Sequence, residues 1–367
     1  MQYTKLKAIN EYVSESINPM KSPDQIFEMY SVPIYDTGHP EYLRGDEIGS
    51  NKVVVRKNDI LLCKINPRIN RVWVVADESE YQNIASSEWI VIRSTSYNPE
   101  FLAWYFRCPK FKKLMTSEVT GIGGSLTRAQ PKAVAEYPVP VLSMDGQEKI
   151  VGILNRVNAI IFARKQELQK LDSLIKARFV ELFGDPITNN KHWDMDTLLG
   201  VLEAGRTVTY GIVQTGDDVD EGIPVFRPID IAGGHVPKRE ELKKTLPEIS
   251  DKYKRTLLKG NELLITIRGS VGETFQVDEE FEGCNVGRNI VPLVTDKKRV
   301  NQRFLKELFA QKPIKDWLKA ITKGIALQGL NMSEFKEMPV IIPEMRLQEE
   351  YVKFAKQIDK SKVVKIA

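Results

Sequence analysis

The chain has 367 residues, of which 42% are hydrophobic and 28% charged, and its formal net charge is +4. This balance is typical of a soluble globular protein of two or three domains, and it permits a nucleic-acid partner without requiring one, because local clustering of charge matters more than the sum. The sequence has no run near the ~18 apolar residues of a membrane helix, no signal-peptide layout and no CxxC pair among its three cysteines, so we expect a cytoplasmic protein without a membrane segment, zinc site or disulfides.

Short β-branched or aromatic runs between polar turns dominate the first part of the chain. They predict strands at residues 53–55, 60–62, 72–75 and 89–92, followed by a helix over residues 101–115. Strands and a helix in this order favour an α+β globular domain.

A long helix is predicted next, because residues 147–183 contain no proline and only one glycine. Alternating spacings of four and three residues within it are typical of a coiled-coil seam. The seam consists of Ile150, Leu154, Val157, Ile161, Arg164, Leu168, Leu171, Ile175, Arg178 and Leu182. At 1.5 Å per residue the helix would be ~50 Å long, and Gly184 followed by Pro186 would end it. An amphipathic helix on the surface of one domain is the alternative.

The last part of the chain predicts a second α+β domain and a second helix. Strands are expected at residues 263–267 and 290–294, followed by a helix over residues 302–321. The seam spacing then returns in Leu347, Tyr351, Phe354 and Ile358, which would supply an antiparallel partner for the first seam. This helix runs out at Ala367 after about twenty residues, and an unpaired seam favours self-association of the isolated chain.

The two domains repeat one pattern. Residues 56–62 and 258–265 share a polar turn, an acidic residue and an apolar strand, at an offset of about 203 residues. Further matches in the same order are Phe101 with Phe304, Phe106 with Phe309, Gly121 with Gly324, Pro138 with Pro339 and Gln147 with Gln348. Repeats of this length are too long for a solenoid and indicate a duplicated domain.

Common catalytic motifs are missing from the sequence. The glycine-rich stretch 121–125 fails the dinucleotide-binding spacing, and there is no Walker phosphate loop. His39, His192 and His235 are scattered and form no HExxH pair. The sequence also lacks an Asn-Pro-Pro-Tyr-like segment of an amino-methyltransferase and a nuclease-type carboxylate cluster, so a catalytic role has little support.

Two segments mark the ends of the predicted long helix: the transition from residues 137–140 to residues 147–151, and residues 179–186. They resemble the start and the closing phrase of the first conserved helix in the specificity subunits of type I restriction-modification systems. Segments similar to the family's target recognition domains are 58–68, 210–214, 222–227 and 323–331. The order of these motifs, their duplication and the intervening helix cover essentially the whole chain.

The resemblance implies an α+β fold of two similar α/β target recognition domains, at residues 1–145 and 186–345. A first conserved spacer helix (residues 146–185) and a second, short or truncated one (residues 346–367) would form an antiparallel coiled coil. The second helix of the family is usually about as long as the first, so the short one here implies incomplete closure near the Phe183 end. Each domain would read half of a split asymmetric site in double-stranded DNA. The apolar seam residues would join the helices and dock two methylation subunits, with restriction subunits added in the full complex. S-adenosylmethionine would bind the methylation subunits, so this chain would be non-catalytic, with no cofactor or metal of its own.

Candidate DNA contacts gather in loops after the predicted strands. Arginine suits guanine and asparagine suits adenine, while hydroxyl, amide and lysine groups can anchor phosphates. The candidates are Lys64, Asn66, Arg68, Asn70, Arg71, Ser125, Thr127, Arg128, Arg206, Thr209, Tyr210, Gln214, Arg268, Ser270, Arg288, Asn289, Lys323, Gln328 and Asn331. The alternatives are a solvated basic loop at residues 64–71, a plain connector at residues 121–128 and a packed core edge at Tyr210.

Two other functions stay open at this point. One is a specificity chain of a related modification or phage-defence system, and the other is a coiled-coil adaptor that binds proteins and no DNA. Within the preferred interpretation, the helix would act as a ruler for half-sites about one helical turn, ~34–36 Å, apart.

Overall fold

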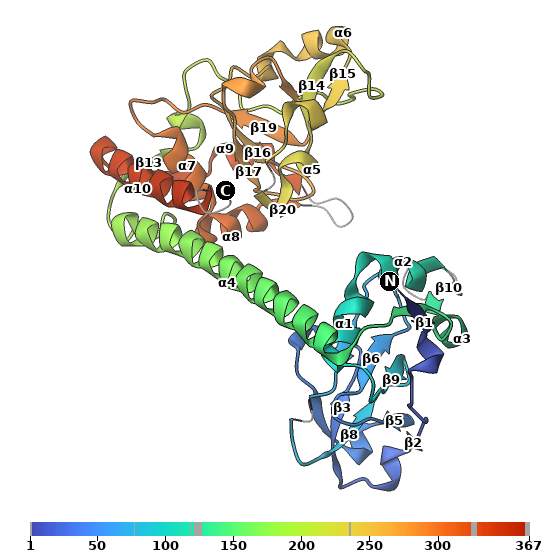
Figure 1. Cartoon of the computed structure of the whole chain (residues 1–367). Coiled ribbons are helices and arrows are strands. Elements are labelled where there is room, and N and C mark those ends of the chain that lie inside the picture. Colours follow the sequence, from blue (N-terminus) through green and yellow to red (C-terminus); the bar gives the residue numbers. More distant parts are fainter. Residues whose placement is uncertain are drawn as a thin grey trace. The chain divides into compact units, whose positions relative to one another are not determined.

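The computed structural model describes residues 2–76, 78–117, 119–120, 127–234, 236–323 and 329–363. Contacts divide the chain into two compact units, Met1–Ala163 and Arg164–Ala367. In Figure 1 the first unit runs from blue to green and the second from green to red. The boundary falls inside the longest helix, so each unit contains one half of it. In the described part of the chain, no helix is long and apolar enough to cross a membrane.

The first unit contains two larger sheets and two short strand pairs in its described residues. A five-stranded sheet has the order β2-β5-β8-β3-β4, and a three-stranded sheet has the order β7-β6-β9. Pairing is antiparallel except between β3 and β8, which run parallel. The strands are β2 (Ser16–Ile17), β3 (Ile26–Tyr30), β4 (Glu41–Arg44), β5 (Lys52–Val54), β6 (Ile60–Cys63), β7 (Val72–Val74), β8 (Gln82–Ala85) and β9 (Trp89–Ile92). The four strands predicted in this region are therefore confirmed, each with its ends within one residue.

The prediction of a single helix over residues 101–115 was wrong, because the structure has two. α1 (Pro99–Arg107) and α2 (Pro109–Ser117) are separated by Cys108, whose backbone is extended at φ −66° and ψ 150°. The ring of Pro109 disfavours a helical conformation of the residue before it, which breaks the helix there. Further elements are β1 (Tyr3–Lys5), β10 (Val119–Thr120), β11 (Arg128–Ala129), α3 (Pro131–Val134) and β12 (Pro138–Pro140), with β1 paired to β12 and β10 to β11.

The second unit has two three-stranded sheets, ordered β17-β16-β19 and β15-β14-β18. The strands are β14 (Ile223–Phe226), β15 (Lys243–Thr245), β16 (Leu263–Thr266), β17 (Thr274–Gln276), β18 (Asn285–Val286) and β19 (Ile290–Leu293). Two short antiparallel pairs accompany them, β13 (Asp194–Thr197) with β22 (Pro339–Ile342) and β20 (Thr322–Lys323) with β21 (Gly329–Leu330). The strands predicted at residues 263–267 and 290–294 are confirmed as β16 and β19.

The helix predicted over residues 302–321 is also two helices, α7 (Gln302–Phe309) and α8 (Lys312–Ala320). Gln311 between them is extended at φ −73° and ψ 141°. Pro313, in the first turn of α8, has no N–H with which to continue the hydrogen bonds of α7. Shorter helices in this unit are α5 (Pro228–Ile231), α6 (Pro247–Ser250) and α9 (Met332–Lys336).

The two units repeat one arrangement of elements. The sheet β7-β6-β9 followed by α1 and α2 corresponds to the sheet β17-β16-β19 followed by α7 and α8. A buried glutamine recurs with it: Gln147 Oε1 accepts from Asn98 N at 2.8 Å, and Gln348 Oε1 accepts from Asn301 N at 2.9 Å. Because the asparagines are the N-caps of α1 and α7, each glutamine fixes the start of one helix to the start of another.

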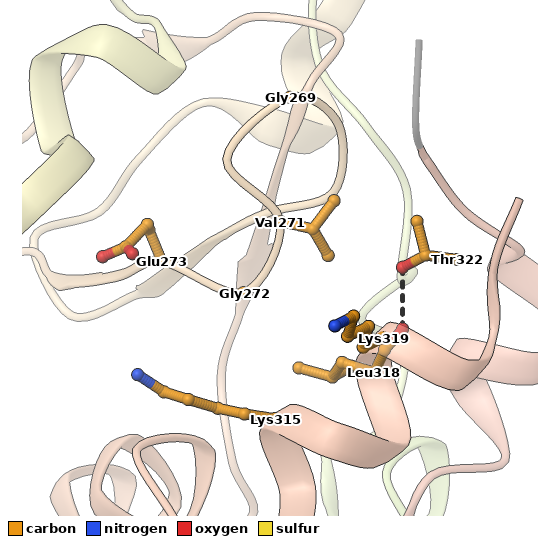
Figure 2. Close-up of a pocket in the computed structure, with 8 residues that line it drawn as sticks. All are labelled: Gly269, Val271, Gly272, Glu273, Lys315, Leu318, Lys319 and Thr322. Carbon is orange, nitrogen blue, oxygen red and sulfur yellow. Dashed lines mark hydrogen bonds between the residues drawn. The ribbon is translucent and has the colours of Figure 1, made fainter. Parts of the chain in front are cut away.

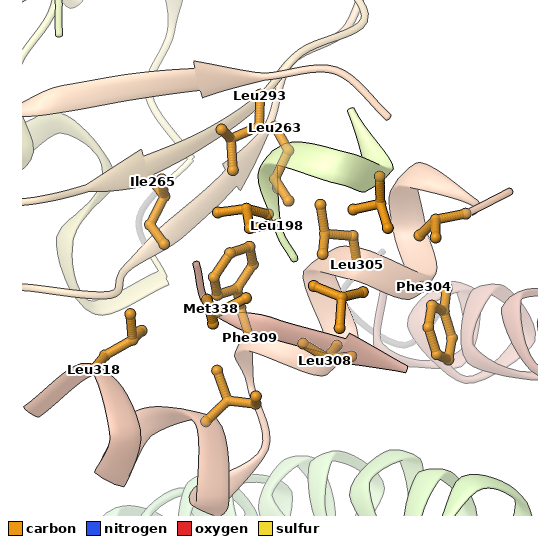
Figure 3. Close-up of a cluster of buried hydrophobic side chains, with 14 of the residues drawn as sticks. Leu198, Leu263, Ile265, Leu293, Phe304, Leu305, Leu308, Phe309, Leu318 and Met338 are labelled. Carbon is orange, nitrogen blue, oxygen red and sulfur yellow. The ribbon is translucent and has the colours of Figure 1, made fainter. Parts of the chain in front are cut away.

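Each unit has its own apolar core beneath the repeated sheet. Figure 3 shows the core of the second unit, where Leu263 and Leu293 from neighbouring strands lie close to Leu305 of α7. In the first unit, Ile60 and its neighbours on β6 pack in the same way with Phe106 of α1. We call the repeated sheet and the two helices that follow it the frame of each unit. Full burial of one such side chain stabilises a fold by about 1.5–3 kcal/mol, so the frame contributes much of the stability of each unit.

The antiparallel helix pair predicted from the seam spacing is present within the second unit. α4 spans Met144–Phe183, and α10 (Met345–Val363) runs antiparallel to its second half. Tyr351 Oη donates to the carbonyl of Ile175 at 3.3 Å, and Lys362 Nζ lies 2.6 Å from a carboxylate oxygen of Asp172. Phe179 and Phe183, which the predicted seam did not include, are fully buried and pack against the Tyr351 ring.

The expected incomplete closure near the Phe183 end was wrong, since α10 begins beside that end and closes it. The uncovered part of the seam lies in the other half of α4. Ile150 packs against the first core, but Val157 and Ile161 expose 48% and 49% of their surface. An antiparallel partner that starts at the C-terminal end of α4 covers the far half last, which explains the difference.

Candidate DNA interface

Two segments that the sequence nominated separately meet in the first unit. Ile65, in the loop after β6, forms an isolated antiparallel bridge with Arg128 of β11. Next to it, Asn66 N donates to the carbonyl of Thr127 at 2.8 Å. These bonds fix the loop and the strand to each other, so their side chains share one surface.

We call this meeting of the loop after β6 with β11 the junction of the first unit, and the second unit contains an equivalent junction. Arg268, in the loop after β16, forms an isolated antiparallel bridge with Gly329 of β21. Leu330 N donates to the carbonyl of Ile267 at 2.8 Å. Both nominated loops therefore meet a short hairpin at the same place in the repeat.

A third segment joins the junction in each unit, immediately before β9 or β19. In the first unit Lys64 N donates to the carbonyl of Glu88 at 3.0 Å. In the second, Ile267 N donates to the carbonyl of Asn289 at 2.9 Å. The nominated pair Arg288 and Asn289 thus belongs to the same surface as Arg268.

Two nominated asparagines serve the first loop itself. Asn66 and Asn70 have left-handed backbones, with φ of 48° and 58°, a conformation that asparagine adopts more readily than most residues. Asn70 Nδ2 donates to the carbonyl of Phe106 at 3.2 Å. Because the Asn70 amide is already engaged, its nomination as an adenine reader is not supported by its placement.

The cations of the first junction differ in exposure. Arg68 and Arg128 are exposed, whereas Lys64 and Arg71 are half-buried. Arg128 forms a two-fold ion pair with Glu88, with Nε 3.2 Å and Nη2 3.3 Å from the two carboxylate oxygens. That pair holds the guanidinium in one orientation at the edge of the surface.

In the second unit, three nominated residues from three separate segments line one cavity of about 250 Å³. They are Tyr210, Arg268 and Arg288. The apolar part of the cavity is formed by Val213, Ile267, Leu330 and Met332. Both arginines are exposed, as is 46% of Tyr210. Beside them, Asn289 Oδ1 is buried and has no hydrogen-bond partner among the described residues.

A glycine brings Tyr210 to this cavity. Ile212 pairs in parallel with Gly287 just after β18, and its N–H donates to the carbonyl of Val286 at 2.8 Å. A Cβ on Gly211 would lie 1.8 Å from that same carbonyl oxygen, so only glycine permits the approach. The sequence nominated Tyr210, but the reason for its position is this long-range contact.

Three other nominated side chains have partners inside the second unit. Arg206 lies 3.6 Å from the buried carboxylate of Glu262. Asn331 is the N-cap of α9, and Lys323 Nζ lies 2.7 Å from Glu334. These placements favour structural roles for the three residues over direct DNA contact.

The remaining nominated residues are placed less tightly or lie outside the described ranges. Ser270 and Gln214 are exposed, and Thr209 and Thr127 are half-buried. Ser125 and Gln328 lie outside the described residues, as do residues 121–124 and His235.

Sequence reasoning missed two lysines beside the second junction. Figure 2 shows a cavity of about 320 Å³ in which Lys315 and Lys319 of α8 lie below the turn that contains Gly269 and Gly272. On an amphipathic helix such lysines look like ordinary exposed residues. The equivalent position of α2 is Lys112, and this recurrence is the only hint that the sequence contains.

Metal-ligating side chains and cysteines of the described residues bear on possible chemistry. None of their His, Cys, Asp and Glu side chains form a group of three or more that could hold a metal ion. Burial raises the pKa of the Cys63 thiol, and it raises that of Cys284 to about 11, so both thiols are neutral near pH 7. The exposed cations, aromatic ring and amides of the two junctions suit binding of an anionic polymer instead.

Comparison with known proteins gives a domain match in the second half of the chain. Residues 190–365 match the model for the type I restriction modification DNA specificity domain. The chain is similar to the EcoBI specificity subunit of a type I restriction enzyme from Escherichia coli, with 30% identity over 213 residues. The match covers 58% of this chain and 44% of that subunit, so it spans less than half of the relative's length.

Two solved structures share the fold. One is a chain from a study of complex assembly and conformational transition in the type I R-M system, with a TM-score of 0.55 and 19% identity, covering 99% of this chain and 91% of that one. The other is the type I restriction-modification S subunit from M. genitalium, with a TM-score of 0.52 and 13% identity, covering 98% and 90%. Residues 190–365 therefore carry a type I restriction modification DNA specificity domain, and the whole chain shares the two-domain α+β fold of the two solved structures.

Proposed function

We propose that this chain is the non-catalytic, DNA-reading subunit of a type I restriction-modification complex, in which each unit reads one half of a split asymmetric site. The observation that carries the proposal is the repeated junction, where a loop, a hairpin and a pre-strand segment meet in both units. Several of the cationic and amide side chains that the sequence predicts as DNA contacts lie at these junctions. Phosphate contacts would position the duplex, and contacts to base edges would specify the sequence.

The exposed half of α4 supports a partner-docking role. Val157, Ile160 and Ile161 expose 48%, 69% and 49% of their surface, which is unusual for neighbouring large aliphatic residues on one helix. We assign this apolar stripe to contacts with the two methylation subunits. The restriction subunits would join the same complex, and S-adenosylmethionine would bind the methylation subunits and not this chain.

The uninterrupted helix supports a spacer role. α4 is continuous over 40 residues and belongs to both units. At 1.5 Å per residue it is about 60 Å long, enough for half-sites about one turn of DNA apart. An insertion of four residues near Leu168 should therefore change the number of unread base pairs between the half-sites.

The function is tested by co-expressing the chain with the methylation subunit of its own operon and mapping methylated adenines across the host genome. Two short defined blocks around an undefined gap are expected. A soluble, intact complex that methylates a continuous motif, or none, would contradict the proposal. Loss of duplex DNA binding at high salt, with partner docking retained, separates it from the coiled-coil adaptor.

A further inference from the structure

Each junction contains one arginine, but the two arginines come from opposite sides of the backbone bridge. In the first unit the bridge joins Ile65 to Arg128 of the hairpin, and in the second it joins Arg268 of the loop to Gly329. The repeat aligns Ile65 with Arg268 and Arg128 with Gly329, so no arginine is shared between aligned positions. The guanidinium nevertheless recurs at one place in the fold, which points to a requirement of the site.

The backbone under both arginines is held firmly. The bridge and the 2.8 Å bonds beside it fix Arg128 through Thr127, and Arg268 through Ile267. A side chain on a fixed backbone is suited to reading a base edge, because its donors must meet acceptors at defined positions. Phosphate contacts demand less, and Lys315 and Lys319 lie near the second junction to provide them.

In the first unit, the ion pair with Glu88 orients Arg128 without using all of its donors. Glu88 takes Nε and one N–H of Nη2. The other N–H of Nη2 and both of Nη1 remain, since guanidinium has five donors. The side chain is 44% exposed, so this outer edge can face a ligand.

In the second unit, Arg268 has no ion pair among the described residues. It faces the cavity that it shares with Tyr210 and Arg288. Asn289 takes the place of Glu88, and its buried Oδ1 lacks a partner in the described part of the chain. The orienting carboxylate of the first unit is thus replaced by an amide, and the guanidinium keeps all its donors for a ligand.

Resting on the proposed function, we propose that Arg128 and Arg268 each read a guanine, one in each half-site, by donating two N–H groups to its O6 and N7. These two acceptors lie side by side in the major groove and match the fork of a guanidinium. Glu88 acts as a positioning residue for Arg128. Arg288 and Tyr210 border the second guanine site.

The test uses the full chain in complex with its methylation subunits and maps methylation on a library of randomised sites. The variants are Arg128→Ala, Arg128→Lys, Arg268→Ala and Arg268→Lys. Each alanine variant should lose about 10- to 100-fold discrimination at one guanine of its own half-site and leave the other half-site unchanged. The lysine variants keep the charge and should retain overall methylation with weaker discrimination at that guanine.

Matched controls come from the turns before β6 and β16, at the opposite ends of these strands from the two junctions. Arg56 and Lys259 occupy equivalent exposed positions before β6 and β16, and their alanine variants should keep the motif of the unmodified complex. Co-purification with the methylation subunits shows that each variant has folded and assembled.

The outcomes distinguish failure of the guanine assignment from failure of the proposed function on which it rests. A uniform loss of methylation at all sites, with no relaxed position, would make the arginines phosphate anchors and overturn the assignment. A motif whose relaxed position is not guanine would overturn it too. If the unmodified complex yields no split motif, the proposed function itself fails, whatever the variants do.

Discussion

Both units bury a carboxylate at the turn before the central strand of the repeated sheet, β6 or β16, but different groups compensate its charge. In the first unit Asp59 forms a two-fold ion pair with Arg93, at 2.7 and 2.6 Å. In the second, Glu262 accepts from the backbone N–H of Lys259 at 3.0 Å, while Arg206 stays 3.6 Å away. A buried carboxylate therefore recurs at this turn, while the groups that compensate its negative charge differ between the units.

Outside the frame the units diverge. The first adds a five-stranded sheet, and the second has a three-stranded one in its place. The residues at the two junctions differ even more: Arg128 belongs to the hairpin of the first unit, whereas Arg268 belongs to the loop of the second. Positions that hold the repeat together keep their chemistry, whereas positions that face a ligand change with what each unit must recognise.

The largest effect is expected from the contrast between the two halves of α4. Phe183→Ala removes a fully buried ring from the second core and should lower the free energy of unfolding by about 3–5 kcal/mol. Val157→Ala, on the exposed half, should change stability by less than about 0.5 kcal/mol but weaken binding of the methylation subunit. Urea unfolding and co-purification measure the two effects. Equal destabilisation by both variants would refute the assignment of Val157 to a docking surface.

The next largest effect separates the two buried carboxylates. Asp59→Ala leaves Arg93 without its partner and should cost about 3 kcal/mol, the lower end for a broken buried pair, because Arg93 is partly exposed. Glu262→Ala removes mainly backbone hydrogen bonds to a charged group and should cost about 2 kcal/mol. Thermal unfolding of both variants tests the order, and a larger loss from Glu262→Ala would reverse the comparison.

A smaller effect is expected from the two glutamines. Gln147→Leu and Gln348→Leu each leave a buried N–H and a carbonyl without a partner and should cost about 1–3 kcal/mol. Gln348 Nε2 also donates to the carbonyl of Arg299 at 3.0 Å, so Gln348→Leu should cost at least as much as Gln147→Leu. Denaturant unfolding of the single variants measures both values. A clearly smaller cost for Gln348→Leu would contradict this order.

The smallest perturbation compares the buried cysteines, one in each unit. Burial raises the pKa of Cys63 above its ordinary value and that of Cys284 to about 11, so the reactive thiolate of both residues is scarce at pH 8. Alkylation by iodoacetamide should therefore be at least about tenfold slower at both than at the half-buried Cys108. Mass spectrometry of the native protein measures the rates, and rapid labelling of Cys284 would contradict its burial.

A good part of the fold was predictable from the sequence. The strands 60–62 and 89–92 follow from local alternation, and the long helix follows from the seam spacing. The duplication follows from matches in the same order at offsets of about 203 and then about 201 residues. The single helices predicted over residues 101–115 and 302–321 were wrong, because Pro109 and Pro313 break them through their backbone restrictions.

The candidate site was predictable only in part. The sequence alone determined which loops carry cations and amides, because residue type and position along the chain decide that. Only the tertiary structure decided that Asn70, Arg206 and Asn331 are engaged inside their units, and that Arg128 and Arg268 occupy one place. The junction is formed by backbone pairing between segments that are far apart in the chain. Alignment of the two repeats cannot reveal that a side chain on one side of this pairing in the first unit is replaced by a side chain on the other side in the second.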